Sequence, residues 1–127
     1  MLLIRAEVEM IQSFRDLTVW QKGMDLALRV YEATEKFPRS EMFGLASQLR
    51  RAATSIPSNI AEGKGIGGLS YPRHLRIAHG SEAELQTQIE LAKRLKFLDD
   101  AEANSLLSQA SEVGRMLVGL ERSLPKN

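Results

Sequence analysis

Five basic side chains in the middle of the chain are the residues best suited to bind a partner. Guanidinium groups donate two parallel hydrogen bonds to a phosphate, and an ammonium group adds a compact positive charge. They lie before, within and after a glycine-rich loop, so antiparallel pairing of the flanking helices would bring them to one half of the domain. This pattern predicts a surface for an anionic partner such as a nucleic acid, and the alternative is a solvated face with one buried Arg–Glu pair. The predicted nucleic-acid-binding residues are Arg50, Arg51, Lys64, Arg73 and Arg76.

A second group of polar side chains lies on the same two segments. Glu62 is expected near the start of the later segment, and Glu84 is expected closer to Arg50 or Arg51. A carboxylate that faces arginine inside a helical bundle is explained better by a satisfied polar network than by acid–base catalysis. The members predicted for this network are Asn59, Glu62, Ser81 and Glu84.

The sequence offers little that could hold a metal or a cofactor. His74 and His79 are five residues apart, or about 140° around a helix, so they do not face one metal ion. The segment GKGIGG has backbone N–H groups that could meet a phosphate, but no strand precedes it, and a flexible connector is the favoured interpretation. We therefore predict no catalytic activity, no cofactor and no metal site.

Composition and charge narrow the class of protein further. The 127 residues carry a formal charge of +1, yet residues 43–79 hold five basic side chains against the single acidic Glu62. A partner attracted by charge is therefore expected at the middle third of the chain. There is no cysteine and no apolar run near the roughly 20 residues needed to cross a bilayer, so a cytoplasmic location is predicted.

The apolar residues recur at steps of three and four, which is the helical period. Thr18 is expected to cap a first helix that ends near Lys36, with two apolar stripes along its length. A second helix is expected from about Ser40 to Glu62, with Pro57 causing a kink or local unwinding. Four glycines between Gly63 and Leu69 are expected to exclude a helix there.

Two further helices follow with heptad patterns. Ser70 is expected to cap the third, whose apolar seam has one polar member, Glu82. An aspartate at 99 or 100 is expected to cap the fourth. No segment alternates with period two, so the fold is predicted to be all-α. The two seams consist of Tyr71, Leu75, Ala78, Glu82, Leu85, Ile89 and Ala92, and of Ala103, Leu106, Ala110, Val113, Leu117, Leu120 and Leu124.

Four amphipathic helices with short connections predict an antiparallel up-down-up-down four-helix bundle. Several helices have more apolar surface than one bundle seam can bury. The first helix has two apolar stripes, and the fourth adds apolar residues beside its seam: Trp20, Met24, Ala27 and Tyr31; Val19, Leu26, Val30 and Ala33; and Leu107, Met116 and Val118. A lone bundle would leave part of this surface exposed. Contiguous exposed apolar side chains usually mark contact sites, so this surplus predicts a subunit interface in preference to scattered surface residues.

Two sequence motifs resemble a known family. The run QLRRAATSIPSNIAEG (residues 48–63), together with IAHGSEAELQTQIELAKRLKFLD (77–99), resembles the four-helix-bundle 23S rRNA intervening-sequence proteins. The accessory variability proteins of diversity-generating retroelements are similar. The resemblance implies a bacterial protein that forms a ring-shaped homopentamer. It also implies possible partnership with RNA or with an RNA-processing or reverse-transcriptase-type protein. Glu82 departs from the pattern, because relatives usually carry a small or apolar residue there.

These observations define an expected organisation and function. Residues 1–13 are predicted to form an N-terminal extension, residues 14–124 the bundle domain and residues 125–127 a C-terminal tail. The bundle is expected to assemble as a cyclic homo-oligomer and to act as a non-catalytic scaffold, which binds structured RNA or an RNA-associated protein through a repeated basic surface. Two alternatives remain: an assembly module that binds no nucleic acid, and a small-ligand protein or enzyme with a pocket near Pro57, Asn59 and Glu62.

Overall fold

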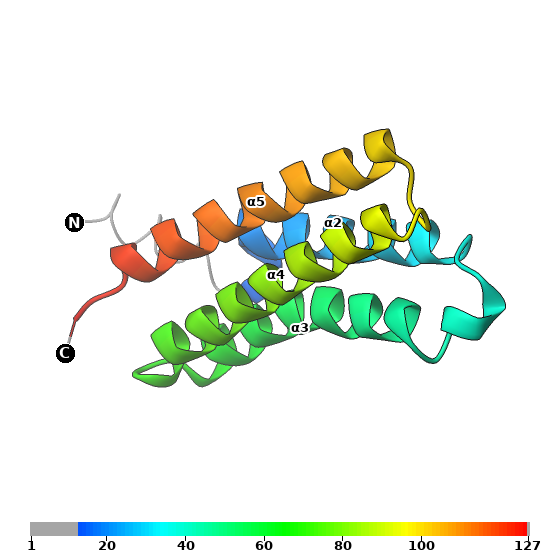
Figure 1. Ribbon diagram of the computed structural model, residues 1–127. Helices are drawn as coiled ribbons and strands as arrows, with labels where there is room; N and C mark the ends of the chain where they lie inside the picture. The colour runs from blue at the N-terminus through cyan, green and yellow to red at the C-terminus, as the bar shows by residue number, and fades with distance from the viewer. Residues whose placement is uncertain (1–12, 127) are drawn as a thin grey trace.

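The chain folds into four long α-helices (Figure 1). The computed structural model describes residues 13–126, and the predicted N-terminal extension lies outside the described residues except for Ser13. No strand occurs between residues 13 and 126, so the prediction of an all-α protein is confirmed. The elements are the 3-10 helices η1 (Phe14–Asp16) and η2 (Arg39–Glu41), and the α-helices α2 (Thr18–Thr34), α3 (Leu45–Ile66), α4 (Ser70–Arg94) and α5 (Asp100–Ser123).

The first helices begin differently from the prediction. Ser13 caps η1, accepting a hydrogen bond from the backbone N–H of Arg15, while the carboxylate of Asp16 accepts one from the N–H of Ser13. Thr18 is the first residue of α2 rather than its cap, because Leu17 occupies the capping position with extended backbone angles. The second predicted helix does not start at Ser40, since η2 and a short turn precede α3.

Helix α3 is longer than its sequence suggests, and it is not interrupted at Pro57. The predicted local unwinding at Pro57 is wrong, and so is the predicted helix end at Gly63, because α3 continues unbroken to Ile66. Tertiary packing offsets the poor local propensity: Pro57 is buried, and a β-carbon placed on Gly63 would lie 2.8 Å from Cβ of His74 on α4. The helix ends only at Gly67, whose φ of 75° favours glycine.

The last two helices follow the predicted seams closely. Ser70 is the first residue of α4, and its side chain makes no capping hydrogen bond, so the predicted cap is wrong there. Asp99 does cap α5: its Oδ1 accepts a 2.7 Å hydrogen bond from the N–H of Glu102. The buried residues of α4 and α5 are Leu75, Ala78, Glu82, Leu85, Ile89 and Ala92, and Ala103, Leu106, Ala110, Val113, Gly114 and Leu117.

Each helix packs against the next one in sequence, and α5 also packs against α2. One apolar core joins all four helices, with Leu26, Leu49, Leu85 and Leu106 among its fully buried side chains. Polar pairs mark the same contacts on the surface. Between α2 and α5 the pairs are Lys22–Glu112 and Arg29–Gln109, and Lys36, just after α2, pairs with Glu102; between α4 and α5 they are Arg76–Glu121 and Lys93–Asn104.

Candidate nucleic-acid interface

The five predicted phosphate-binding residues do not form one cluster. Arg50 turns toward α2, where its guanidinium carbon lies 4.7 Å from the centroid of the Tyr31 ring. Its Nε donates a 2.8 Å hydrogen bond to Oγ1 of Thr34, which is buried. Arg50 is thus occupied inside the subunit by a cation–π contact and a hydrogen bond.

Arg51 and Lys64 lie on the side of α3 that faces α4. Arg51 is exposed and lines a polar depression of about 420 Å³ together with Glu84, Gln48 and Gln88. Lys64 lies nearer the end of α3, its Nζ 5.9 Å from the centroid of the Tyr71 ring. Glu84 was expected to lie close to Arg50 or Arg51, and it lines the same depression as Arg51.

Burial also affects the Tyr71 phenol beneath Lys64. Partial burial raises the pKa of Tyr71 above its usual value of 10.0, because the charged phenolate would lose hydration. The phenol therefore stays neutral at physiological pH and offers its ring to the ammonium group.

Arg73 and Arg76 lie together at the start of α4, beside the end of α5. Nη1 of Arg76 is 3.0 Å from a carboxylate oxygen of Glu121, and both side chains remain partly open to water. A depression of about 430 Å³ here is lined by Arg73, Arg76, Glu121 and Lys126 among others. Surface ion pairs contribute little stability, so Arg76 can exchange Glu121 for a phosphate at small cost.

The same pair of helices carries two arginines that were not predicted from the sequence. Arg115 and Arg122 line a second depression of about 470 Å³ between α4 and α5, with His79 on the opposite wall. They are seven residues apart, which places them on one face of a helix and could have revealed them. We call Arg73, Arg76, Arg115, Arg122 and Lys126 the basic face.

A buried carboxylate lies beneath the basic face. Glu82 is only 3% exposed, and one of its oxygens accepts a hydrogen bond from Nε2 of Gln86. Its other oxygen is 3.8 Å from Nε2 of His79. The side chain fills a notch at Gly114 on α5, where a β-carbon would lie 2.2 Å from Oε1. Glu82 is thus accommodated in an otherwise apolar seam for two reasons: its carboxylate is hydrogen-bonded, and Gly114 leaves space for its side chain.

The predicted polar network forms only in part. Oγ of Ser81 on α4 lies 2.8 Å from Oγ of Ser55 on α3, and the amide of Asn59 donates to both the carbonyl and the hydroxyl of Ser55. Ser55, which was not predicted from the sequence, is thus the centre of this cluster. Oε2 of Glu62 instead lies 3.4 Å from Nε2 of His74. His74 is near the start of α4, where Glu62 was expected. Glu84 lies outside the cluster in the depression with Arg51.

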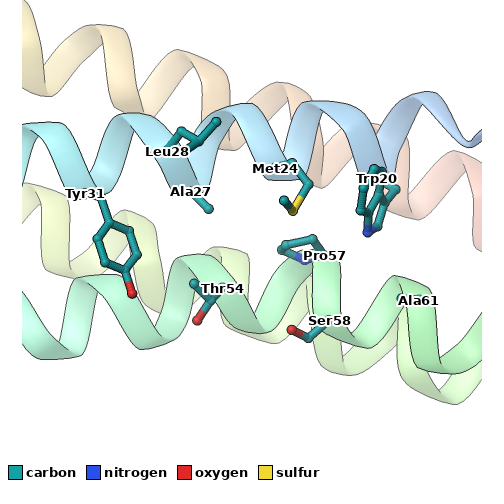
Figure 2. A pocket seen from close by; sticks show the side chains of 9 residues that line it. All are labelled: Trp20, Met24, Ala27, Leu28, Tyr31, Thr54, Pro57, Ser58 and Ala61. Carbon is teal, nitrogen blue, oxygen red and sulfur yellow. The ribbon is translucent and has the colours of Figure 1, made fainter. Parts of the chain in front are cut away.

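A different surface is formed where α2 packs on α3. An apolar groove of about 400 Å³ runs between them, and Figure 2 shows Met24 and Pro57 facing one another across it. Met24, Leu28 and Tyr31 are 39%, 60% and 44% exposed, which is unusual for a row of large apolar side chains. The groove is lined by Trp20, Met24, Ala27, Leu28, Tyr31, Thr54, Pro57, Ser58 and Ala61.

Metal sites and membrane spans are both missing from the described part of the chain. Between residues 13 and 126, no three His, Asp or Glu side chains are grouped so that they could hold a metal ion. Over the same residues, no helix combines the length and the apolar character needed to cross a bilayer.

The fold is that of an all-α protein with four long helices in the described part of the chain. The chain belongs to the family described as 23S rRNA-intervening sequence protein, whose model matches residues 15–119. It is also similar in fold to a crystal structure from Bacteroides thetaiotaomicron, described as a protein of unknown function from the S23 ribosomal protein family. That similarity has a TM-score of 0.75 at 22% identity and covers 84% of this chain and 100% of the other. No curated protein matches this chain.

Proposed function

We propose that this protein is a non-catalytic, homo-oligomeric scaffold that binds structured RNA, or a protein carried on RNA, through the basic face. The observation that carries the proposal is the grouping of five cations along α4 and α5, two of them from the set predicted from the sequence. The names of the matching family and of the similar crystal structure both refer to the ribosome or its RNA, which supports an RNA partner.

The proposed subunit is an antiparallel up-down-up-down bundle. The polar pairs between α2 and α5 support this arrangement, because residue numbers rise along one helix as they fall along the other. The pairs Glu62–His74 and Ser55–Ser81 between α3 and α4 follow the same rule. Such an arrangement places the start of α4 beside the end of α5, which is where the basic face lies.

The proposed assembly is a ring, with five subunits as the number implied by the family resemblance. The apolar groove supports self-association, since burying exposed apolar surface yields about 25 cal/mol per Å². One basic face neutralises few phosphates, and its affinity alone would be modest. A ring repeats the face in every subunit, so that one RNA can contact several copies and gain avidity.

The dependence of RNA affinity on salt concentration distinguishes binding through phosphate contacts from nonspecific adhesion. Each phosphate contact releases about 0.7 to 0.9 of a counterion, which sets the slope of log affinity against log salt concentration. We expect a structured RNA hairpin to bind at low salt and to dissociate at high salt. Arg73→Ala combined with Arg122→Ala should weaken binding and lower the slope by roughly one for each phosphate that the variant no longer neutralises.

The matched control for this experiment is Arg94→Ala. Arg94 is exposed at the other end of α4, outside the basic face, so its replacement should leave affinity and slope unchanged. Arg51→Ala and Lys64→Ala then test whether the RNA extends onto α3. Equal affinity of the wild type and the Arg73/Arg122 variant would remove the basic face from the site.

The alternative function is an assembly module that binds only protein. The ion pair between Arg76 and Glu121 favours this alternative, because a carboxylate within the basic face weakens its field. Such a module would keep its oligomeric mass and show no salt-dependent RNA binding. A small ligand in the apolar groove is the other possibility, and it would raise the melting temperature without changing the oligomeric mass.

A further inference from the structure

The connection between η2 and α3 presents a second unusual apolar residue. Phe43 is 100% exposed, so none of its ring contacts the rest of the subunit. The turn around it is well fixed: the N–H of Gly44 donates to the carbonyl of Glu41, and the N–H of Leu45 donates to Oε1 of Glu41. Burying a phenylalanine side chain is favourable, and a single subunit leaves this contribution unused.

We infer that the apolar groove of one copy of this chain holds Phe43 of a second copy. The groove has the right chemistry, since Trp20, Met24, Leu28 and Pro57 present ring and aliphatic surface to it. It also has the right size. A cavity of about 150 Å³ is enough for benzene, so a groove of about 400 Å³ has room for a phenyl ring and part of its turn.

Phe43 cannot fill the groove of its own subunit. The nearest groove residue on α3 is Thr54, nine residues after the first residue of that helix, Leu45. Nine residues of α-helix span about 14 Å, and α3 is unbroken over this stretch.

The charges beside the two surfaces are complementary. Arg39 is exposed, lies four residues before Phe43, and makes no ion pair with another described residue. Asp25 and Glu32 lie three residues before and four residues after Leu28, so they flank the outer edge of the groove on α2. Both are exposed and also lack an ion pair within the described residues. A second copy seated through Phe43 would bring Arg39 toward these carboxylates.

This contact joins two different surfaces of the same chain. In a row of subunits joined in this way, one end has a free groove and the other end has a free Phe43. The row closes into a ring when the rotation between neighbouring subunits brings these two ends together. The inference rests on the proposed self-association and specifies the residues that produce it. It does not depend on RNA, which the basic face binds on the other pair of helices.

The first test is the oligomeric mass of Phe43→Glu, measured by light scattering on the size-exclusion peak without RNA. Because Phe43 touches nothing in its own subunit, the variant should keep its helical circular dichroism and fall to the 14.2 kDa mass of one chain. Leu69→Glu is the control, since Leu69 is 71% exposed in the α3–α4 connection and should leave the mass unchanged. A monomeric wild type, or a Phe43→Glu variant with wild-type mass, would overturn the inference.

The second test separates this contact from a symmetric one. Leu28→Lys blocks the groove but leaves Phe43 intact, and Leu28 is exposed enough for the subunit to fold normally. Each variant alone should be monomeric, whereas a mixture of Phe43→Glu and Leu28→Lys should form a pair with twice the mass of one chain. A mixture without that pair, or a dimer of either variant alone, would contradict the inference. RNA binding measured separately on Phe43→Glu tells whether the basic face acts independently of assembly.

Discussion

The contact between α2 and α3 and the contact between α4 and α5 present surfaces of two different chemical kinds. On the surface between α2 and α3, Met24, Leu28 and Tyr31 line an apolar groove that is open to water. On the surface between α4 and α5, Arg115 and Arg122 line a depression above the buried Glu82. An apolar groove gains from contact with another apolar surface, whereas a cationic face attracts an anion. This difference is what the proposed function requires: assembly through one pair of helices and RNA binding through the other.

The interiors of the same two contacts differ as well. Gly23 on α2 faces Ile56 and Pro57 on α3, and a β-carbon there would meet them at 3.5 Å and 3.6 Å, which is ordinary van der Waals distance. Gly114 on α5 has no such room, because the carboxylate of Glu82 occupies the space. A glycine at a helix contact is thus optional in the first case and required in the second.

The largest expected effect is that of Gly114→Ala. The added methyl group must displace Glu82, and overpacking of this kind costs about 1 to 3 kcal/mol. Alanine gains about 0.5 to 1 kcal/mol of helix propensity, which offsets only part of the loss. Because the methyl group would overlap the Glu82 carboxylate directly, we expect a cost at the upper end of this range and a net decrease of about 2 kcal/mol in the free energy of unfolding, measured by urea denaturation at a fixed chain concentration.

Gly119→Ala is the control on the same helix. Nothing lies within 4 Å of a β-carbon at Gly119, so this variant should be as stable as the wild type or more stable. Combining Gly114→Ala with Glu82→Ala should restore part of the lost stability, because the Glu82 carboxylate that the new methyl group would displace is then absent. If Gly114→Ala and the double variant lost the same stability, Glu82 would not be the group that fills the notch.

A smaller effect is expected for Arg50→Ala. The change removes the cation–π contact with Tyr31 and the hydrogen bond to Thr34, which together are worth about 1 to 2 kcal/mol. The Thr34 hydroxyl still donates to the carbonyl of Val30 and is not left unsatisfied. We expect thermal unfolding at a lower temperature with unaltered RNA affinity. A lower affinity at normal stability would return Arg50 to the binding site, while Arg51→Ala serves as an exposed control for the melting temperature alone.

The helices themselves could be predicted from the sequence with few errors. The buried positions of α3, α4 and α5 recur at the helical period, and periodicity alone identifies them. The errors lie where tertiary packing overrides local propensity. Pro57 and Gly63 both predict a break in α3, yet each is buried and packs closely against a neighbouring helix. A sequence shows that a residue is a poor helix former, but not what it gains from its neighbours.

The candidate site was harder to predict for a different reason. Grouping basic residues by their position in the chain placed Arg50 with Arg73, although the helix turns Arg50 toward α2. The same grouping hid Arg115 and Arg122 in a segment with a net negative charge. Helix faces, rather than segments, decide which charges meet. Glu82 was recognised as the polar member of its seam, but only the packing of α5 shows that Gly114 makes room for it.

The smallest expected effect is that of Gly23→Ala, which compares the α2–α3 contact directly with the α4–α5 contact. A β-carbon at Gly23 meets Ile56 and Pro57 without a clash, so helix propensity should dominate. We expect an increase of about 0.5 to 1 kcal/mol in the free energy of unfolding, measured under the same conditions as Gly114→Ala. The oligomeric mass should not change, since Gly23 is buried and does not line the groove. If Gly23→Ala destabilised the protein as much as Gly114→Ala, both contacts would be equally tight. The open groove would then have to arise from the side chains that line it, and not from looser packing between α2 and α3.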